Sequence, residues 1–313
     1  MPDQGNETRA PAEPSPAPIT YSHEPSAPPA AASIRKVTRR ENYLLEFGDY
    51  QLEVDPQDGG RIVAFRLRGQ NALLEKSASP DAYGSSFWPS PQSAWRWPPP
   101  FEFDRLGWKV SILGERLTLE SLTNAELGLT ARQELVGDPD RELLVIEYGL
   151  ENRGKEATKV APWQNTRMPP GGLTFFPSQH GTLPPSSLEL RPEAGVVWMQ
   201  HDPAGKKEGK AFADGDEGWL AHLRGDLLLV KVFPDVPRER QAPEEAEIEI
   251  YVHGSGRFVE VEQQGEYVEL EPGASSTWTV RWLLRQLPKA IPHQPGTGLL
   301  DYTRKLVQSA TRK

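Results

Sequence analysis

Two carboxylates two residues apart, Glu260 and Glu262, offer the clearest acid–base chemistry in this sequence. Because side chains alternate between the two faces of a strand, a strand over 257–262 would place both on one face and Val259 and Val261 on the other. Closely spaced carboxylates raise one another's pKa, so one of them would suit a general base. The alternative is the solvated face of an antiparallel sheet, which predicts the same alternation.

A second segment, 247–253, has the same pattern, with Ile248, Ile250 and Val252 on one face. If the two strands are neighbours, one open face collects the polar side chains of both. That face would hold Glu249, Tyr251, His253, Glu260 and Glu262.

Residues 84–108 hold four of the nine tryptophans and five prolines. Proline removes backbone donors and fixes φ, so we expect a rigid aromatic loop here rather than an ordinary helix or strand. Flat indole faces beside amide and charged groups suit sugars, whose C–H faces stack on aromatic rings. The candidates for sugar contact in this segment are Trp88, Gln92, Trp95, Arg96 and Trp97. The alternative is a loop that closes one end of a β-sandwich.

The histidines show no metal-ligand spacing, and with zero cysteines there is no thiolate site, so we expect no metal. His180 and His253 fall where loops would border a sandwich and are the better candidates for a general acid. The formal charge of −9, with no long basic run, argues against nucleic acid as a partner. No apolar run reaches the roughly 20 residues of a membrane span.

Residues 1–33 include eight prolines and seven alanines, so we expect residues 1–40 to form a disordered tail. The first residues lack the basic and then apolar pattern of a signal peptide. The protein is then either cytoplasmic or, if a signal was removed, periplasmic or tethered to the cell envelope, which the Pro/Ala-rich tail slightly favours.

Short segments with strand patterning and turn residues between them follow from residue 43 onward. They include 50–54, 61–67, 116–122, 127–135, 143–152, 227–233, 247–253, 257–262, 266–271 and 277–284. Strands at this spacing, without helices between them, predict one large all-β domain over 41–287, an antiparallel two-sheet β-sandwich. Residues 288–313 would form an extension with one short helix.

Three stretches together resemble the galactose mutarotase-like (aldose 1-epimerase-like) superfamily. They are the turn Gly59-Gly60-Arg61-Ile62 with its following strand, the strand and turn over 145–154, and the closing strands after Glu262 with their Pro272-Gly273 turn. The tryptophan segment resembles the signature of a bacterial branch of unknown function within that superfamily. The resemblance covers roughly 43–287.

This resemblance implies a mutarotase-like sandwich whose concave face receives a carbohydrate. In such enzymes a glutamate takes the proton of the anomeric hydroxyl while a histidine protonates the ring oxygen. By motif position Glu262 matches that base best and Glu260 second, and no cofactor is required.

The sequence departs from the superfamily where the acid histidine is expected, because 161–167 contains none. Trp163, Gln164 and Arg167 of that segment are candidates for sugar binding, and His180 or His253 would have to supply the acid. Three hypotheses therefore stay open: an epimerase-type enzyme acting on a sugar, a non-catalytic carbohydrate-binding module, and a β-sandwich scaffold of the envelope.

Overall fold

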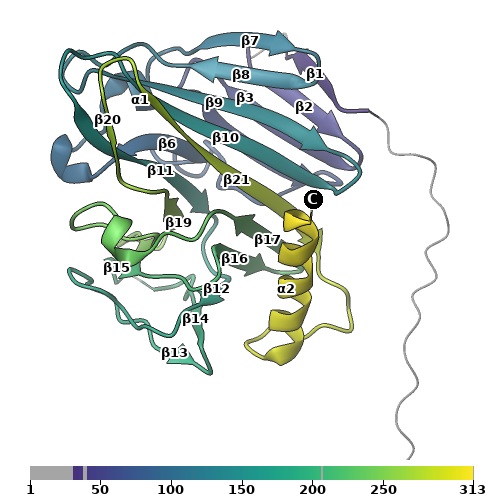
Figure 1. Ribbon diagram of the computed structural model, residues 1–313. Coiled ribbons are helices and arrows are strands. Elements are labelled where there is room, and N and C mark those ends of the chain that lie inside the picture. Colours follow the sequence, from purple (N-terminus) through teal and green to yellow (C-terminus); the bar gives the residue numbers. More distant parts are fainter. Residues whose placement is uncertain (1–30, 38–40, 206, 313) are drawn as a thin grey trace, which may run out of the picture.

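Two large antiparallel sheets face each other in the computed structural model of this chain, and a C-terminal helix packs beside them (Figure 1). The structure is described for residues 31–37, 41–205 and 207–312. This architecture confirms the predicted all-β two-sheet sandwich. The predicted disorder of the tail falls mainly on residues 1–30 and 38–40, which lie outside the described residues.

The first sheet carries the candidate site and has the strand order β1-β2-β3-β4-β6-β11-β19-β18-β15. Two short strands lie off this path, β5 beside β4 and β20 beside β11. The bounds are β1 (Ser33–Lys36), β2 (Tyr43–Phe47), β3 (Tyr50–Asp55), β4 (Arg61–Leu67), β5 (Gln70–Asn71), β6 (Ser85–Ser90), β11 (Thr158–Met168), β15 (Gly209–Ala213), β18 (Ile248–Val252), β19 (Val259–Gln264) and β20 (Val268–Leu270).

The second sheet has the strand order β13-β14-β12-β16-β17-β21-β10-β9-β8-β7. Its strands are β7 (Lys109–Leu113), β8 (Arg116–Glu120), β9 (Leu129–Asp138), β10 (Leu143–Asn152), β12 (Leu173–Pro177), β13 (Pro192–Glu193), β14 (Val196–Gln200), β16 (Trp219–Arg224), β17 (Leu227–Val232) and β21 (Ser275–Gln286). The helical elements are the short helix α1 (Phe101–Asp104), the 3₁₀ turns Gln92–Ala94 and Arg238–Arg240, and α2 (Thr297–Thr311).

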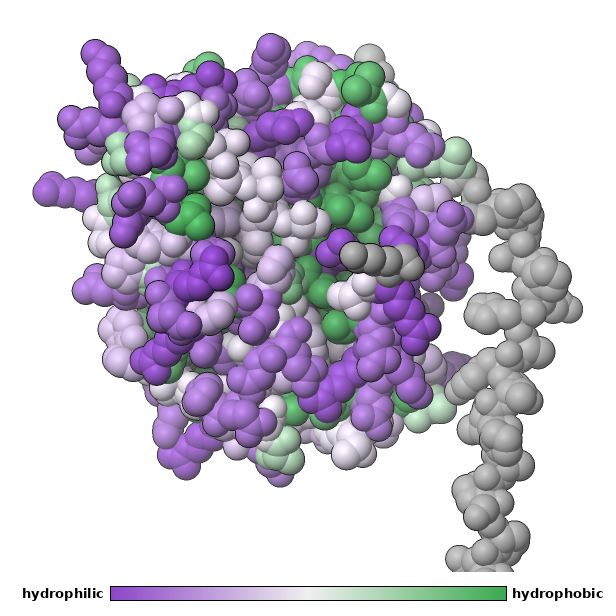
Figure 2. All heavy atoms as spheres, in the orientation of Figure 1, coloured by the Kyte–Doolittle hydropathy of each residue, from purple (hydrophilic) through white to green (hydrophobic). Residues whose placement is uncertain are grey.

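The core lies between the sheets because alternation turns every second side chain inward. Leu52 and Phe65 of the first sheet and Ile146 and Trp282 of the second are all buried, and the rings of Phe65 and Trp282 are 5.8 Å apart. The surface seen in Figure 2 is mainly hydrophilic, with hydrophobic residues in separate areas. Among the described residues, no helix combines the length and apolar character needed to cross a bilayer.

The tryptophan segment corrects one expectation, because its first part is a buried strand and not a loop. β6 pairs with β11 over six residues, with Pro89 opposite Pro162. The carbonyl of Pro162 accepts from Gly265 on its other side, and the carbonyl of Pro89 accepts from Trp95 Nε1. Both prolines thus occupy a pair that exchanges no backbone hydrogen bonds, where their missing N–H groups cost nothing.

The two ends of the described chain add to the sandwich. Ser33–Lys36, which the sequence places in the tail, forms β1 and pairs along β2, because its backbone completes the sheet edge while Ile34 packs on the core. The predicted C-terminal helix is α2, whose Leu299, Thr303 and Ala310 are buried against a second apolar cluster beneath β17.

Candidate functional site

Five adjacent strands of the first sheet, β6, β11, β19, β18 and β15, arrange the candidate residues in three rows. Residues opposite each other on antiparallel strands point to the same face, so each row is a line of neighbouring side chains. The first row holds Trp88, Trp163 and Gln264; the second holds Ser86, Asn165, Glu262, Glu249 and Phe212; the third holds Arg167, Glu260, Tyr251 and Lys210. The pairing of β18 with β19 confirms that their polar side chains share one face.

A cavity of about 580 Å³ opens over these rows, between the sheet and the tryptophan segment. Such a volume is in the range of small-molecule sites. Seven predicted residues line it: Trp88, Gln92, Trp97, Trp163, Arg167, His253 and Glu260. A separate cavity of about 620 Å³ over β3 and β4 contains none of the predicted residues.

Three of the four candidate tryptophans, Trp88, Trp95 and Trp163, pack against one another. The ring centroid of Trp163 is 5.4 Å from that of Trp88, edge to face, and 6.2 Å from that of Trp95, stacked. Trp95 is buried and does not line the cavity. Trp97 is 67% exposed and leans edge-on toward Trp88 at 6.3 Å. The segment therefore packs a core and also presents an indole face to solvent.

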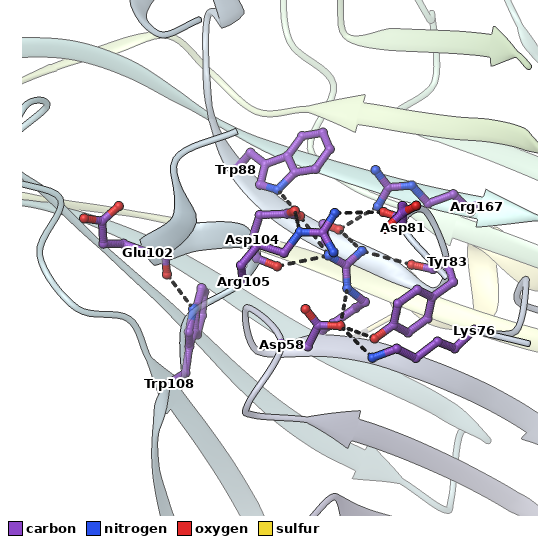
Figure 3. Close-up of polar contacts among 12 residues, drawn as sticks. Asp58, Lys76, Asp81, Tyr83, Trp88, Glu102, Asp104, Arg105, Trp108 and Arg167 are labelled. Atoms are coloured by element: carbon purple, nitrogen blue, oxygen red, sulfur yellow. Dashed lines mark hydrogen bonds and ion pairs between the residues drawn. The ribbon is translucent and has the colours of Figure 1, made fainter. Parts of the chain in front are cut away.

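Asp104, at the end of α1, holds the inner wall of the cavity in place (Figure 3). One carboxylate oxygen accepts from Arg61 Nη2 at 2.8 Å and from Trp88 Nε1 at 3.1 Å, and the other lies 2.9 Å from Arg105 Nε. Arg61 belongs to the Gly-Gly-Arg-Ile turn and is almost fully buried. That turn thus fixes the orientation of Trp88 through a buried ion pair.

Arg167 and Glu260 form the polar pair that faces the cavity. Arg167 Nε donates to Glu260 Oε1 at 2.7 Å, its Nη1 donates to Ser86 Oγ at 2.6 Å, and its guanidinium lies 4.9 Å from the Trp88 ring centroid. These contacts fix a planar donor and a carboxylate side by side in the cavity that Trp97 also lines. Such an arrangement offers a ligand both hydrogen-bond donors and acceptors.

Glu262 lies deeper than Glu260 and does not line the cavity, because Trp163 and Lys210 cover it. Trp163 Nε1 donates to Glu262 Oε2 at 2.8 Å, and Lys210 Nζ lies 3.5 Å from the same oxygen. Lys210 Nζ lies 2.5 Å from Glu249 Oε2, and 4.7 Å from the Trp163 ring centroid. Burial raises the pKa of both Glu249 and Glu262. Burial alone would lower the pKa of Lys210, but the charges of the two carboxylates outweigh it, so the pKa of Lys210 is raised.

The remaining predicted residues lie apart from this constellation or are already engaged. His180 is exposed after β12 and does not line the cavity, and Arg96 is exposed outside it. Gln164 points into the core, where it contacts Tyr148, Gln263 and Trp282. His253 lines the cavity, but Arg257 Nη2 donates to its Nε2 at 3.1 Å, and its Nδ1 is 2.9 Å from Ser255 Oγ.

Several residues of the site were not predicted, chiefly Asn165, Arg105, Lys210, Glu208 and Arg257. Alternation along 158–168 is a signal that could have found Asn165, because it shares a face with Trp163 and Arg167 while Gln164 does not. Lys210 carries no such signal, since β15 becomes a neighbour of β18 only in the folded sheet. Among the described residues, no group of three or more His, Asp or Glu side chains is placed to hold a metal ion.

The fold described above is a β-sandwich like that of galactose mutarotase-like proteins. A galactose mutarotase-like protein from Lactobacillus casei superposes with a TM-score of 0.57 at 12% identity, covering 78% of this chain and 100% of that one. A galactose mutarotase-like protein from Clostridium acetobutylicum gives a TM-score of 0.52 at 11% identity, covering 82% of this chain and 98% of that one.

A TPR-domain containing protein from Parabacteroides distasonis also matches, with a TM-score of 0.58 at 16% identity and 82% of this chain covered. The present chain spans about half of that protein, 49% of its length. A comparison with curated proteins found no match. Residues 41–285 match the family model described as a domain of unknown function, DUF4380, and the chain belongs to that family.

Proposed function

We propose that this protein binds a carbohydrate in the cavity between the tryptophan segment and the first sheet. The observation that carries the proposal is the position of Trp97, whose indole is 67% exposed at the edge of the cavity that Arg167 and Glu260 also line. A sugar ring stacked on Trp97 would place its hydroxyls toward this pair. Aromatic faces combined with a few fixed polar groups are typical of small-molecule sites.

A glycan array tests this proposal, probed with the full chain and with two variants. Trp97→Ala removes the exposed stacking face, and Phe101→Ala removes a neighbouring aromatic that is 58% exposed but does not line the cavity. We expect affinity for the retained glycans to fall at least about tenfold for Trp97→Ala and to stay unchanged for Phe101→Ala. Absence of any retained glycan, or equal losses in both variants, would overturn the proposal in favour of a scaffold role.

A second candidate function is acid–base chemistry at the anomeric centre of the bound sugar. Glu260 supports it, because this carboxylate lines the cavity, is oriented by Arg167 and lies directly opposite Tyr251 in the ladder. Anomer interconversion measured by polarimetry on hexoses, hexuronates and sugar phosphates tests it. Acceleration that Glu260→Gln abolishes, while glycan retention persists, would support catalysis; no acceleration on any sugar would leave the binding function alone.

A further inference from the structure

The first sheet carries a second cavity on the same face as the proposed sugar site. This second cavity, of about 620 Å³, lies over β3 and β4, whereas the first, of about 580 Å³, lies beside the tryptophan segment. Asp55 lines the second cavity and is opposite Arg61 in the ladder of β3 and β4, so both point to one face. Arg61 Nη1 donates to Ser86 Oγ at 2.8 Å, and Ser86 is opposite Asn165, which lines the first cavity. A row of four side chains thus runs from one cavity to the other.

The distance between the two cavities follows from the strand order. Asp55 is on β3 and Asn165 is on β11, and β4 and β6 lie between them, so the two residues are three strand spacings apart. Because neighbouring strands lie about 4.8 Å apart, the two residues are about 14 Å from each other. One sugar ring is too short to contact both, whereas several linked rings are long enough.

One segment, between β5 and β6, lines both cavities. Its Lys76 and Tyr83 line the second cavity, and its Asp81 lines the first (Figure 3). Beneath this segment the guanidinium of Arg61 lies 4.8 Å from the ring centroid of Tyr83 and donates to Asp104, which lines the first cavity. A single buried side chain therefore separates the walls of the two cavities. Lys76 and Asp81 are exposed, so a ligand that extends from one cavity to the other would meet charged groups on the way.

Each cavity is lined by a buried asparagine whose side-chain carbonyl lacks a partner. In the second cavity Asn42 Nδ2 donates to Glu53 Oε1 at 2.8 Å, but within the described part of the chain Asn42 Oδ1 has no hydrogen-bond partner. The same holds for Asn165 Oδ1 in the first cavity, and both side chains are almost fully buried. Buried acceptors are normally paired, so each needs a donor from outside the chain, and a sugar hydroxyl is such a donor.

The other groups around the second cavity also suit hydroxyl groups. Asp55 Oδ1 accepts from the backbone N–H of Gln57 at 2.9 Å, and among the described residues its Oδ2 has no partner. Arg66 uses Nη1 to bind Glu53 at 3.1 Å, which leaves its other N–H groups as donors. Tyr83 lines the cavity, but its side chain is almost fully buried. This cavity would therefore hold a sugar by its hydroxyls and not by stacking.

We propose that the carbohydrate bound by this protein is an oligosaccharide, with one unit in the first cavity and a later unit of the same chain in the second. The inference rests on the proposed function, because the first unit is the sugar stacked on Trp97. It adds a second binding site, in which Asn42 and Asp55 make the affinity depend on the length of the glycan.

Isothermal titration calorimetry with glycans of increasing length tests the proposal. The probes are the monosaccharide, disaccharide, tetrasaccharide and hexasaccharide of cellulose, amylose, xylan, galactan and polygalacturonate. In the series that binds, we expect the Kd to fall at least about tenfold from the monosaccharide to the hexasaccharide, because two linked sites bind one chain with a high effective concentration. Equal affinity for every length would overturn the oligosaccharide and leave the proposed function standing. Absence of binding in every series would overturn both.

Two variants test whether the second cavity causes the dependence on length. Asn42→Ala and Asp55→Asn should each weaken hexasaccharide binding at least about fivefold and leave monosaccharide binding unchanged. Asp49→Asn is the matched control, because Asp49 is exposed and lines neither cavity, so it should change no affinity. Trp97→Ala should weaken the binding of every length. Asp55→Asn keeps the side-chain volume, so it decides the matter even if Asn42→Ala does not fold. A length dependence that persists in the folded variants of the second cavity would overturn the proposal.

Discussion

The indole N–H of Trp163 donates a 2.8 Å hydrogen bond to Oε2 of Glu262, so one side chain forms the wall of the cavity and also covers the buried acid below it. Trp163 is buried among Trp88, Trp95 and Lys210. Changes to this indole therefore reach both the cavity and the buried charges.

Trp163→Phe should destabilise the protein because it removes the hydrogen bond to Glu262 and leaves Oε2 without its closest donor. We expect a loss of about 1–3 kcal/mol in the free energy of unfolding, measured by urea denaturation near neutral pH. A double-mutant cycle with Glu262→Leu, which removes the acceptor, separates the hydrogen bond from the lost indole volume. A coupling energy of zero would contradict this account.

Asp104→Ala should be among the more damaging single changes at the cavity wall. It leaves the guanidinium of Arg61 buried without its 2.8 Å partner and releases Trp88 Nε1, so we expect a loss of about 3–5 kcal/mol in unfolding free energy. Asp81→Ala is the control, because Asp81 is exposed and only its backbone carbonyl is used, by Arg105. Similar losses in both variants would show that the ion pair is not the cause.

Gly59→Ala tests how the Gly-Gly-Arg-Ile turn positions the site. A Cβ there would lie 2.5 Å from the backbone carbon of Asp104, and φ is +68°, so the substitution pushes against the backbone that holds the buried ion pair. We expect a loss of at least about 3 kcal/mol. At Gly69, φ is +83° with nothing within 4 Å, so Gly69→Ala should show only the backbone strain of about 1–2 kcal/mol. Thermal unfolding of both variants makes the comparison.

Stability should fall on acidification because two histidines are buried in neutral form. Thr174 Oγ1 lies 2.7 Å from His201 Nε2 and 2.9 Å from His222 Nδ1. Burial lowers the pKa of His201 from 6.5 to about 4. Burial also lowers the pKa of His222, and the charge on His201 lowers it further. On acidification the unfolded chain protonates these histidines before the folded chain does. The contribution of the neutral histidines to stability is therefore complete above their pKa in the unfolded chain, and it is lost as the pH falls toward their pKa in the folded chain.

For His201 alone, the loss in unfolding free energy between pH 7 and pH 5 should be about 2 kcal/mol. His201→Gln should flatten this part of the curve, whereas His180→Gln, at an exposed position, should leave it unchanged. Denaturation midpoints recorded across this pH range provide the measurement. An unchanged slope in His201→Gln would exclude the buried pair as the cause.

The sequence by itself determined the sandwich and one face of the site. Period-two alternation in β18 and β19 placed Tyr251 and Glu260 on a common face, and the ladder pairs them directly. It also located α2 and most of the longer strands, because amphipathic patterns are local properties of a sequence. Pro89 of β6 misled the prediction, because a proline is tolerated at this position only through its pairing with Pro162.

Only the tertiary structure decided the depth and the partners of each group. Glu260 and Glu262 share a face, yet Glu260 lines the cavity and Glu262 is fully buried. The reason is that Trp163 from β11 and Lys210 from β15 cover Glu262. β11 and β15 are far apart in the sequence, and they flank β19 and β18 only in the folded sheet. Alternation predicts which side of a strand a residue occupies. Its burial and its charged neighbours depend on which strands lie beside it in the sheet, and no local sequence pattern predicts that.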